Sequence, residues 1–275
     1  MSKHLVLILL FLGIPMFGCS SGGGFPAPVG TPPPPPPPPP PPVQAADVAG
    51  TWFSRIANNA VNCGMGEFID AQAIVITQDD SVIALSMSTG NTFSGTVNGD
   101  IIEWTGSFEE RGGTTTFTSL SITASGSSAS GNATWTWTDG IDSCNGTMEI
   151  VASRDWGVEE SQHNSSPYIA DNLEFTDGVA FIAGTAQHIK DKDYFSFVLA
   201  ADATVQAELS HFDLQTSDLD LEILDENLNQ IALSDSVDGF EKVEAQLQAG
   251  VTHYIVMLPI SITGPASYIL SIDVN

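Results

Sequence analysis

The stretch Ser217–Ser236, SDLDLEILDENLNQIALSDS, shows the pattern that repeats along most of the chain. Its apolar residues Leu219, Leu221 and Ile223 alternate with carboxylates, which is the period of a β-strand with one buried face. The segment LDENLNQ has the Asp and Asn content of a turn, and IALSD resumes a strand pattern. We therefore expect a strand, a turn and a second strand, with the carboxylates mostly on the solvent face.

The same period predicts an all-β protein with two folded parts. Segments rich in Thr, Ile, Val and aromatic residues between Val48 and Arg154 are separated by tight turns, which predicts about eight strands in an up-and-down β-barrel. About eight alternating segments in the second half predict two packed sheets. The expected domains are a barrel over 47–155, a polar linker over 156–170 and a β-sandwich over 171–275.

The charge balance restricts the class of partner. The chain has 33 acidic side chains against 7 basic ones, a formal net charge of -26. Nucleic acid and bare anionic lipid would be repelled, so we expect no nucleic-acid partner. A solvated acidic surface that maintains solubility is one explanation of this charge, and selection of partners by charge is the other.

The first residues predict export and lipidation. Lys3 precedes an apolar run that is too short for a membrane-spanning helix, which is typical of a signal peptide over 1–18. The ending MFGC resembles the lipobox of bacterial lipoproteins, which implies a lipid on Cys19 and membrane attachment through it. Ser20 follows where an inner-membrane retention signal would have Asp, which implies the outer membrane of a Gram-negative cell. An ordinary signal peptide with another cleavage site is the alternative.

A tether over 19–46 follows the signal. It combines a Gly/Ser segment with an unbroken proline run from Pro32 to Pro42, and a polyproline II helix of that length is a semi-rigid spacer of roughly 34 Å. With Cys19 assigned to lipid, Cys63 and Cys144 remain as a pair, which predicts a disulfide in an oxidising compartment. A metal site shared by these two cysteines is the alternative, although zinc takes four ligands.

Two residues indicate the type of barrel. AGTWF places Trp52 in the first strand and IVASR places Arg154 at the end of the last, an arrangement that resembles the lipocalin and avidin-like barrels. The resemblance implies barrel closure by Arg154 stacked on Trp52, which a cation above an indole favours. Three further tryptophans are candidates to line an interior pocket for a small apolar ligand, and filling of the interior is the alternative. They are Trp104, Trp135 and Trp137.

The second half resembles a known accessory domain. The segments DKDYFSFVLAADATVQAEL, SDLDLEILDENLNQIALSD, VEAQLQAGVTHYIVM and ASYILSI are similar to the bacterial pre-peptidase C-terminal domain, a jelly-roll-like β-sandwich. The resemblance implies a non-catalytic module that acts in secretion, localisation or binding of polymers such as collagen or polysaccharide.

Some relatives in that family bind calcium, which the resemblance extends to this chain. The matching positions supply carboxylate and amide oxygens, which suit Ca²⁺. They are Glu160, Asn164, Asp191 and Asp193. The alternative is that Asp191 and Asp193 are turn residues at the start of a strand. The stretch 225–236 does not fit an EF-hand loop, because Gln230 stands where Gly is needed and Ser236 where Glu is needed.

Catalytic motifs are absent from the sequence. It has no G-x-S-x-G, H-E-x-x-H, S-x-x-K or G-x-x-x-x-G-K pattern. We therefore expect a non-enzymatic, surface-anchored lipoprotein that binds an extracellular polymer, without a cofactor except for the calcium considered above. The alternatives are a lipocalin-like carrier of a small apolar molecule and a hydrolase hidden in the barrel.

Overall fold

The structure, a computed structural model, describes residues 36–38, 44–61, 66–87, 90–110, 112–237 and 239–275. The predicted signal peptide, the lipidation residue Cys19, most of the tether and Cys63 lie outside these ranges. The residues from 42 to 275 form one compact unit. Within the described part of the chain, no helix combines the length and apolar character needed to cross a membrane.

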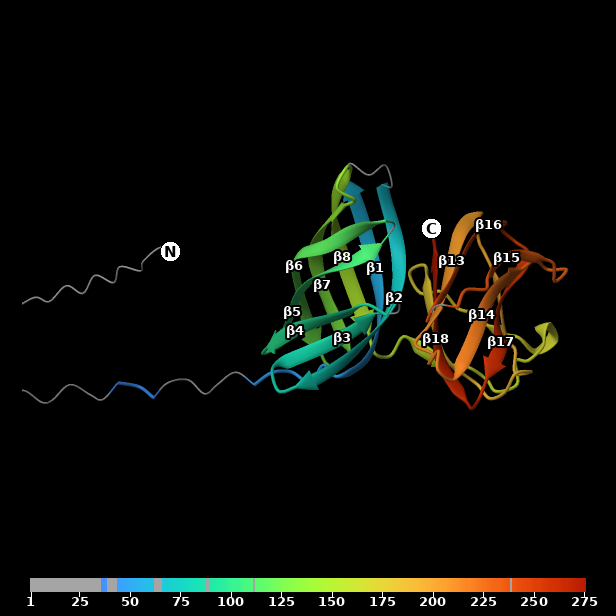
Figure 1. Cartoon of the computed structure of the whole chain (residues 1–275), viewed down its shortest axis with the longest axis horizontal. Helices are drawn as coiled ribbons and strands as arrows, with labels where there is room; N and C mark the ends of the chain where they lie inside the picture. The colour runs from blue at the N-terminus through green and yellow to red at the C-terminus, as the bar shows by residue number, and fades with distance from the viewer. Residues whose placement is uncertain (1–35, 39–43, 62–65, 88–89, 111, 238) are drawn as a thin grey trace, which may run out of the picture. The chain divides into compact units, whose positions relative to one another are not determined.

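The first half folds into a closed antiparallel barrel of eight strands, which confirms the predicted architecture (Figure 1). Each strand bonds to the next along the chain, and the barrel closes where β1 pairs with β8. Closure gives every strand a partner on both sides, although β3 pairs with β2 only over Ile74–Asp79. The strands are β1 (Gly50–Val61), β2 (Gly66–Asp79), β3 (Val82–Met87), β4 (Thr92–Asn98), β5 (Ile101–Glu110), β6 (Gly113–Ser125), β7 (Ser128–Thr138) and β8 (Ser143–Ser153).

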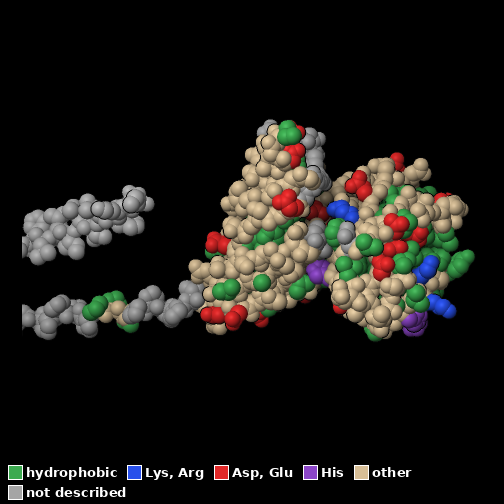
Figure 2. Space-filling view, viewed as in Figure 1, with side chains coloured by type: hydrophobic (Ala, Val, Ile, Leu, Met, Phe, Trp, Pro, Cys, Tyr) green, Lys and Arg blue, Asp and Glu red, His purple; other side chains and the backbone are tan. Residues whose placement is uncertain are grey.

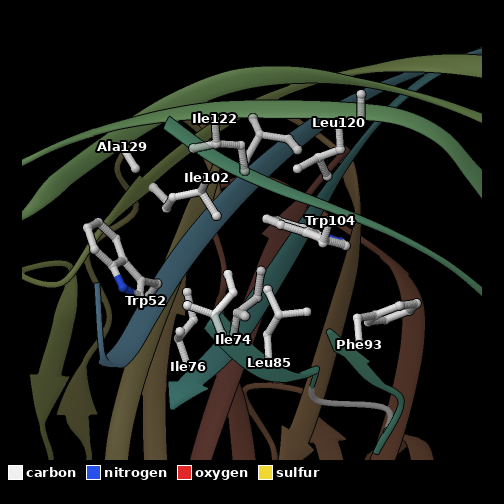
Figure 3. Close-up of a cluster of buried hydrophobic side chains, with 14 of the residues drawn as sticks. Trp52, Ile74, Ile76, Leu85, Phe93, Ile102, Trp104, Leu120, Ile122 and Ala129 are labelled. Atoms are coloured by element: carbon white, nitrogen blue, oxygen red, sulfur yellow. The ribbon is translucent and has the colours of Figure 1, made fainter. Parts of the chain in front are cut away.

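Alternation along these strands places one set of side chains inside the barrel. Trp52 and Ile56 of β1 point inward and meet Ile74 and Ile76 of β2 in a single buried apolar cluster. Figure 3 shows Trp52, Ile74 and Ile76 converging with Trp104 and other side chains of the same cluster. The barrel interior is therefore packed mainly with apolar side chains, and the buried polar residues Ser54, Asn58 and Gln72 lie on the same strand faces.

The second half forms two five-stranded sheets, so the predicted β-sandwich is confirmed. One sheet has the order β10-β12-β17-β14-β15 and the other the order β16-β13-β18-β11-β9. Side chains from both sheets, such as Phe195 and Leu209, share one buried cluster. The strands are β9 (Gly157–Glu159), β10 (Asp171–Asn172), β11 (Val179–Ala186), β12 (Asp193–Val198), β13 (Ala203–Ser210), β14 (Ser217–Leu224), β15 (Gln230–Ser234), β16 (Glu241–Leu247), β17 (Thr252–Ile262) and β18 (Ala266–Val274).

The predicted strand, turn and strand at 217–236 are β14, a turn and β15. Asp225 holds the turn, because its Oδ1 accepts hydrogen bonds from the backbone N–H groups of Asn227 and Asn229 at 2.8 and 2.7 Å. The apolar side chains of β14 are buried, as is Ser217 at its start, while Asp218, Asp220 and Glu222 alternate with them and are partly exposed. The pattern in the sequence therefore identified the buried face correctly.

The segment 156–170 contains ordered structure. Trp156 stacks on Phe181 of β11 with ring centroids 6.4 Å apart, and β9 pairs in parallel with β11. A short 3-10 helix, η1 (Pro167–Ile169), precedes β10.

Candidate functional site

Trp52 and Arg154 meet where the barrel closes. The Arg154 guanidinium carbon lies 4.5 Å from the centroid of the Trp52 ring. Arg154 Nη2 also donates to the carbonyl of Asp47 at 2.9 Å, and Trp52 Nε1 donates to the carbonyl of Val48 at 2.9 Å. The first strand, the last strand and the segment before β1 are thus tied at one point.

The three candidate ligand tryptophans lie within the packed barrel interior. Trp104 and Trp135 are buried, and Trp137 packs against the same apolar cluster. The Trp135 ring lies on Gly146, where an added Cβ would come within 2.5 Å of the ring. Among the described residues, no partner accepts a hydrogen bond from the indole N–H of Trp104 or Trp135. The geometry favours the interpretation of these residues as core.

Two hollows open on the barrel wall, with volumes of about 680 and 820 Å³. Their linings consist mainly of hydroxyl, amide and carboxylate side chains, and they share Asn132 and Glu149. None of the candidate tryptophans lines either hollow.

Cys144 is the second residue of β8 and lies close to the end of β1. Its neighbour Asn145 lies opposite Val61, and Cys63 follows Val61 by two positions in the sequence. Because Cys63 lies outside the described residues, the disulfide between the two cysteines stays a prediction.

Two of the four residues predicted to bind calcium, the half-buried Glu160 and the buried Asp193, meet at the hydroxyl group of Tyr268. The Tyr268 hydroxyl lies 2.7 Å from Glu160 Oε2 and 2.6 Å from Asp193 Oδ2. A tyrosine hydroxyl has one proton to donate, so the second short contact requires a proton on a carboxyl group. Burial raises the pKa of Asp193 to about 9, and a hydrogen bond and negative charge from Glu160 add to the shift. Asp193 therefore carries a proton at neutral pH.

The other two predicted ligands bond elsewhere. Asn164 is 1% exposed, and its Nδ2 donates to Asp171 Oδ2 at 3.2 Å. Asp191 Oδ2 accepts a hydrogen bond from the backbone N–H of Gln187 at 2.7 Å. Within the described ranges, no group of three or more His, Cys, Asp or Glu side chains is arranged to hold a metal ion. Two carboxyl groups supply fewer oxygens than the six to eight that Ca²⁺ takes.

A second candidate site lies on the outer face of the sheet that contains β14. Tyr194 of β12 is opposite Val256 of β17, Val256 is opposite Glu222 of β14, and Glu222 is opposite Leu233 of β15. Tyr254 lies two residues along β17 from Val256 and so faces the same way. We call Tyr194, Tyr254, Asp220 and Glu222 the tyrosine–carboxylate face. Figure 2 shows acidic side chains gathered over β14 with hydrophobic side chains between them.

Burial and neighbouring negative charges raise pKa values on this face. Burial raises the pKa of Asp220 to about 6, and the negative charges of Asp218, Glu241, Asp235 and Glu222 raise it further. Burial also raises the pKa of Tyr194, with a further contribution from Glu222. The face thus presents amphipathic phenol rings beside a concentrated negative charge, which suits a ligand with apolar surface and hydroxyl or cationic groups.

No family model matches the chain, and no curated protein matches it. The solved structures that resemble part of the chain include two with 14% identity and a TM-score of 0.32, each of which covers 38% of this chain. One is the Aeromonas hydrophila protein PliG, a periplasmic inhibitor of g-type lysozyme, 96% covered. The other is the pre-peptidase C-terminal domain of a collagenase from Bacillus anthracis, 94% covered. Likeness at this level carries no information about ligand or activity.

Several residues of these sites were not among those predicted from the sequence. They lie on strands or next to segments in which apolar and polar residues alternate, and they are Tyr268, Asp171, Tyr194 and Tyr254. Alternation could have placed Tyr194 and Tyr254 on the face opposite the buried residues Phe195 and Ile255. The pairing of strands β12, β17 and β14 that brings them together was not visible in the sequence.

Proposed function

We propose that this chain is a non-enzymatic binding module, held at the cell envelope by a lipid on Cys19, which attaches to an extracellular polymer through the tyrosine–carboxylate face. The observation that carries the proposal is the row from Tyr194 through Val256 and Glu222 to Leu233, which crosses four neighbouring strands. Four strands span roughly 14 Å, so an extended ligand would contact several of them at once.

The chemistry of the face favours one class of polymer. Half-buried phenol rings offer apolar contact and a hydroxyl group, and Tyr is enriched at protein interfaces for that reason. Asp220 and Glu222 accept hydrogen bonds from hydroxyl groups and attract cations, whereas they repel anions. We therefore favour a neutral or cationic polymer, either polysaccharide or protein.

The carboxyl group with the most strongly raised pKa, that of Asp193, is buried, which supports a binding module over a hydrolase. Asp193 is 2% exposed and lies beneath Tyr268, where a polymer substrate would not reach it. A carboxyl pair used for hydrolysis has to flank an accessible bond. The carrier alternative receives less support, because Trp104 and Trp135 pack within the barrel core.

Binding of the purified full chain to insoluble collagen, cellulose, chitin and peptidoglycan tests the proposal. We expect sedimentation with at least one neutral or cationic polymer, and none with the anionic control polymers DNA and heparin. Failure to bind every neutral and cationic polymer would contradict the proposal, and so would equal binding to heparin.

A further inference from the structure

Strand β2 of the barrel is paired along only half of its β3 side. β3 pairs with Ile74–Asp79, and among the described residues no other strand continues that ladder over Gly66–Ala73. Backbone groups on such a strand edge need partners, and an open edge invites pairing with another chain.

The last residue of the sequence supplies partners to this edge. Asn275 Oδ1 accepts a hydrogen bond from the backbone N–H of Ile69 at 2.7 Å, and Asn275 Nδ2 donates to the Ile69 carbonyl at 3.1 Å. The carboxamide thus bonds both backbone groups of one residue, as a neighbouring strand would. Asp273 accepts a further hydrogen bond from the backbone N–H of Ala71.

Asn275 and Asp273 are fixed by hydrogen bonds to other residues of the sandwich. The backbone of Asn275 pairs with that of Thr204 in both directions, at 2.9 and 2.8 Å. Asp273 is 2% exposed and accepts hydrogen bonds from Gln206 Nε2 and Asn275 Nδ2. The side chains that reach the barrel are therefore already ordered by the sandwich.

An apolar contact lies beside the hydrogen bonds. Phe53, Ala71 and Ala73 of the barrel are buried in one cluster with Val179 and Phe181 of β11. The rings of Phe53 and Phe181 are 5.3 Å apart between centroids.

Two further contacts join the barrel to the residues that follow it. Arg55 Nε donates to the Asp177 carbonyl at 2.8 Å. Gly157 lies against the Phe53 ring, where an added Cβ would come within 2.3 Å of it.

We infer that the barrel and the sandwich work as one rigid body, aligned by a latch in which Asp273 and Asn275 cap the unpaired half of β2. Burial of that half also removes an edge at which two copies of the chain could associate. The 820 Å³ hollow, lined in part by Arg55, Glu149 and Asn275, exists in its present form only while the latch is closed. The inference is independent of the ligand proposed above.

Hydrogen exchange of backbone amides in the purified full chain tests the latch. We expect Asn275→Ala to speed exchange of the Ile69 and Ala71 amides about tenfold or more, while strands β13 and β18 keep their protection. Asn275→Asp has the same shape but replaces the amide donor by a carboxylate oxygen that would face the Ile69 carbonyl and Asp273, so it should give at least as large an increase at the same residues. Asn227→Ala, in the turn after β14, is the matched control and should change nothing in β2.

Two results would overturn the latch. Unchanged exchange at Ile69 and Ala71 in both Asn275 variants would show that the contact does not protect the edge. Equal acceleration in β2, β13 and β18 would show that Asn275 supports the sandwich as a whole.

Discussion

Tyr194 and Glu222 lie opposite the same residue, Val256, on its two neighbouring strands. The register of β17 therefore sets a phenol ring and a carboxylate on one face, with the fully buried side chain of Val256 between them. Because the face combines the half-buried rings of Tyr194 and Tyr254 with negative charge, its ligand affinity should depend on both apolar contact and charge.

The first prediction concerns pH and polymer binding. Burial, followed by the charge of neighbouring carboxylates, raises the pKa of Asp220 to about 6, so this group loses its charge as the pH falls below that value. We expect polymer binding to weaken between pH 7 and pH 5, and Asp220→Asn to weaken it at pH 7 and reduce the pH dependence. Glu226→Gln, on the adjacent turn, serves as the charge-matched control. Identical binding curves for all three proteins at both pH values would count against a role for Asp220.

The second prediction concerns barrel closure. Arg154→Ala removes the cation over Trp52 and the hydrogen bond to Asp47, and we expect the free energy of unfolding to fall by about 1–3 kcal/mol. Arg154→Lys keeps a positive charge without the planar group, so it should lose less. Urea denaturation measures both values. An Arg154→Ala protein as stable as the wild type would exclude a structural contribution from this contact.

The third prediction concerns packing in the barrel. An added Cβ at Gly146 would lie 2.5 Å from the Trp135 ring and 2.7 Å from the Asn59 carbonyl oxygen. Gly146→Ala should therefore lower the free energy of unfolding by about 1–3 kcal/mol through overpacking. Gly264→Ala is the matched control, since no atom lies within 4 Å of its added Cβ. Thermal unfolding of the two variants should differ clearly, and equal melting temperatures would show that the Trp135 ring is free to move.

The fourth prediction concerns calcium at Glu160 and Asp193. A cation that binds only the folded state stabilises it by mass action, but two carboxyl groups supply fewer oxygens than the six to eight that Ca²⁺ takes. We therefore expect millimolar Ca²⁺ to leave the melting temperature unchanged in the wild type, in Glu160→Gln and in the control Glu159→Gln, whose position ends β9. A rise in the wild-type melting temperature that Glu160→Gln abolishes and Glu159→Gln keeps would show instead that this pair binds calcium.

The fifth prediction concerns the pH dependence of stability at Asp273. Burial raises the pKa of this carboxyl group to about 7; the negative charge of Asp70 raises the pKa as well, and the positive charge of Lys242 lowers it. A carboxyl group whose folded pKa is raised contributes stability below its unfolded pKa of 3.8 and loses that contribution as the pH rises through 7. The stability of Asp273→Asn relative to wild type should therefore increase from pH 5 to pH 7.5, by at most about 1.4 kcal/mol per pH unit. Urea denaturation at both pH values measures the difference, and a constant difference would contradict the shift.

Local sequence pattern was sufficient to predict much of this fold. Alternation at 217–236 identified β14 and β15, and the strand count with Trp52 indicated the barrel. These features depend on neighbouring residues, which a sequence displays directly.

The sites depend on contacts that alternation cannot specify. Tyr268 meets Glu160 across 108 positions of sequence, and Ile69 meets Asn275 across 206. Such contacts follow from strand order and register, and register is set by the completed sheets. For the same reason the sequence could not show which of its 33 acidic residues share a face with Tyr194 and Tyr254.

Binding through the tyrosine–carboxylate face is best tested with a Tyr194→Ala, Tyr254→Ala double variant, whose affinity is measured for a polymer that sediments the wild-type protein. We predict a loss of affinity of tenfold or more, as expected for aromatic residues at the centre of an interface. Tyr168→Ala, which removes a tyrosine that is 94% exposed on η1, should bind like the wild type. Unchanged affinity in the double variant, or an equal loss in Tyr168→Ala, would contradict binding through the tyrosine–carboxylate face.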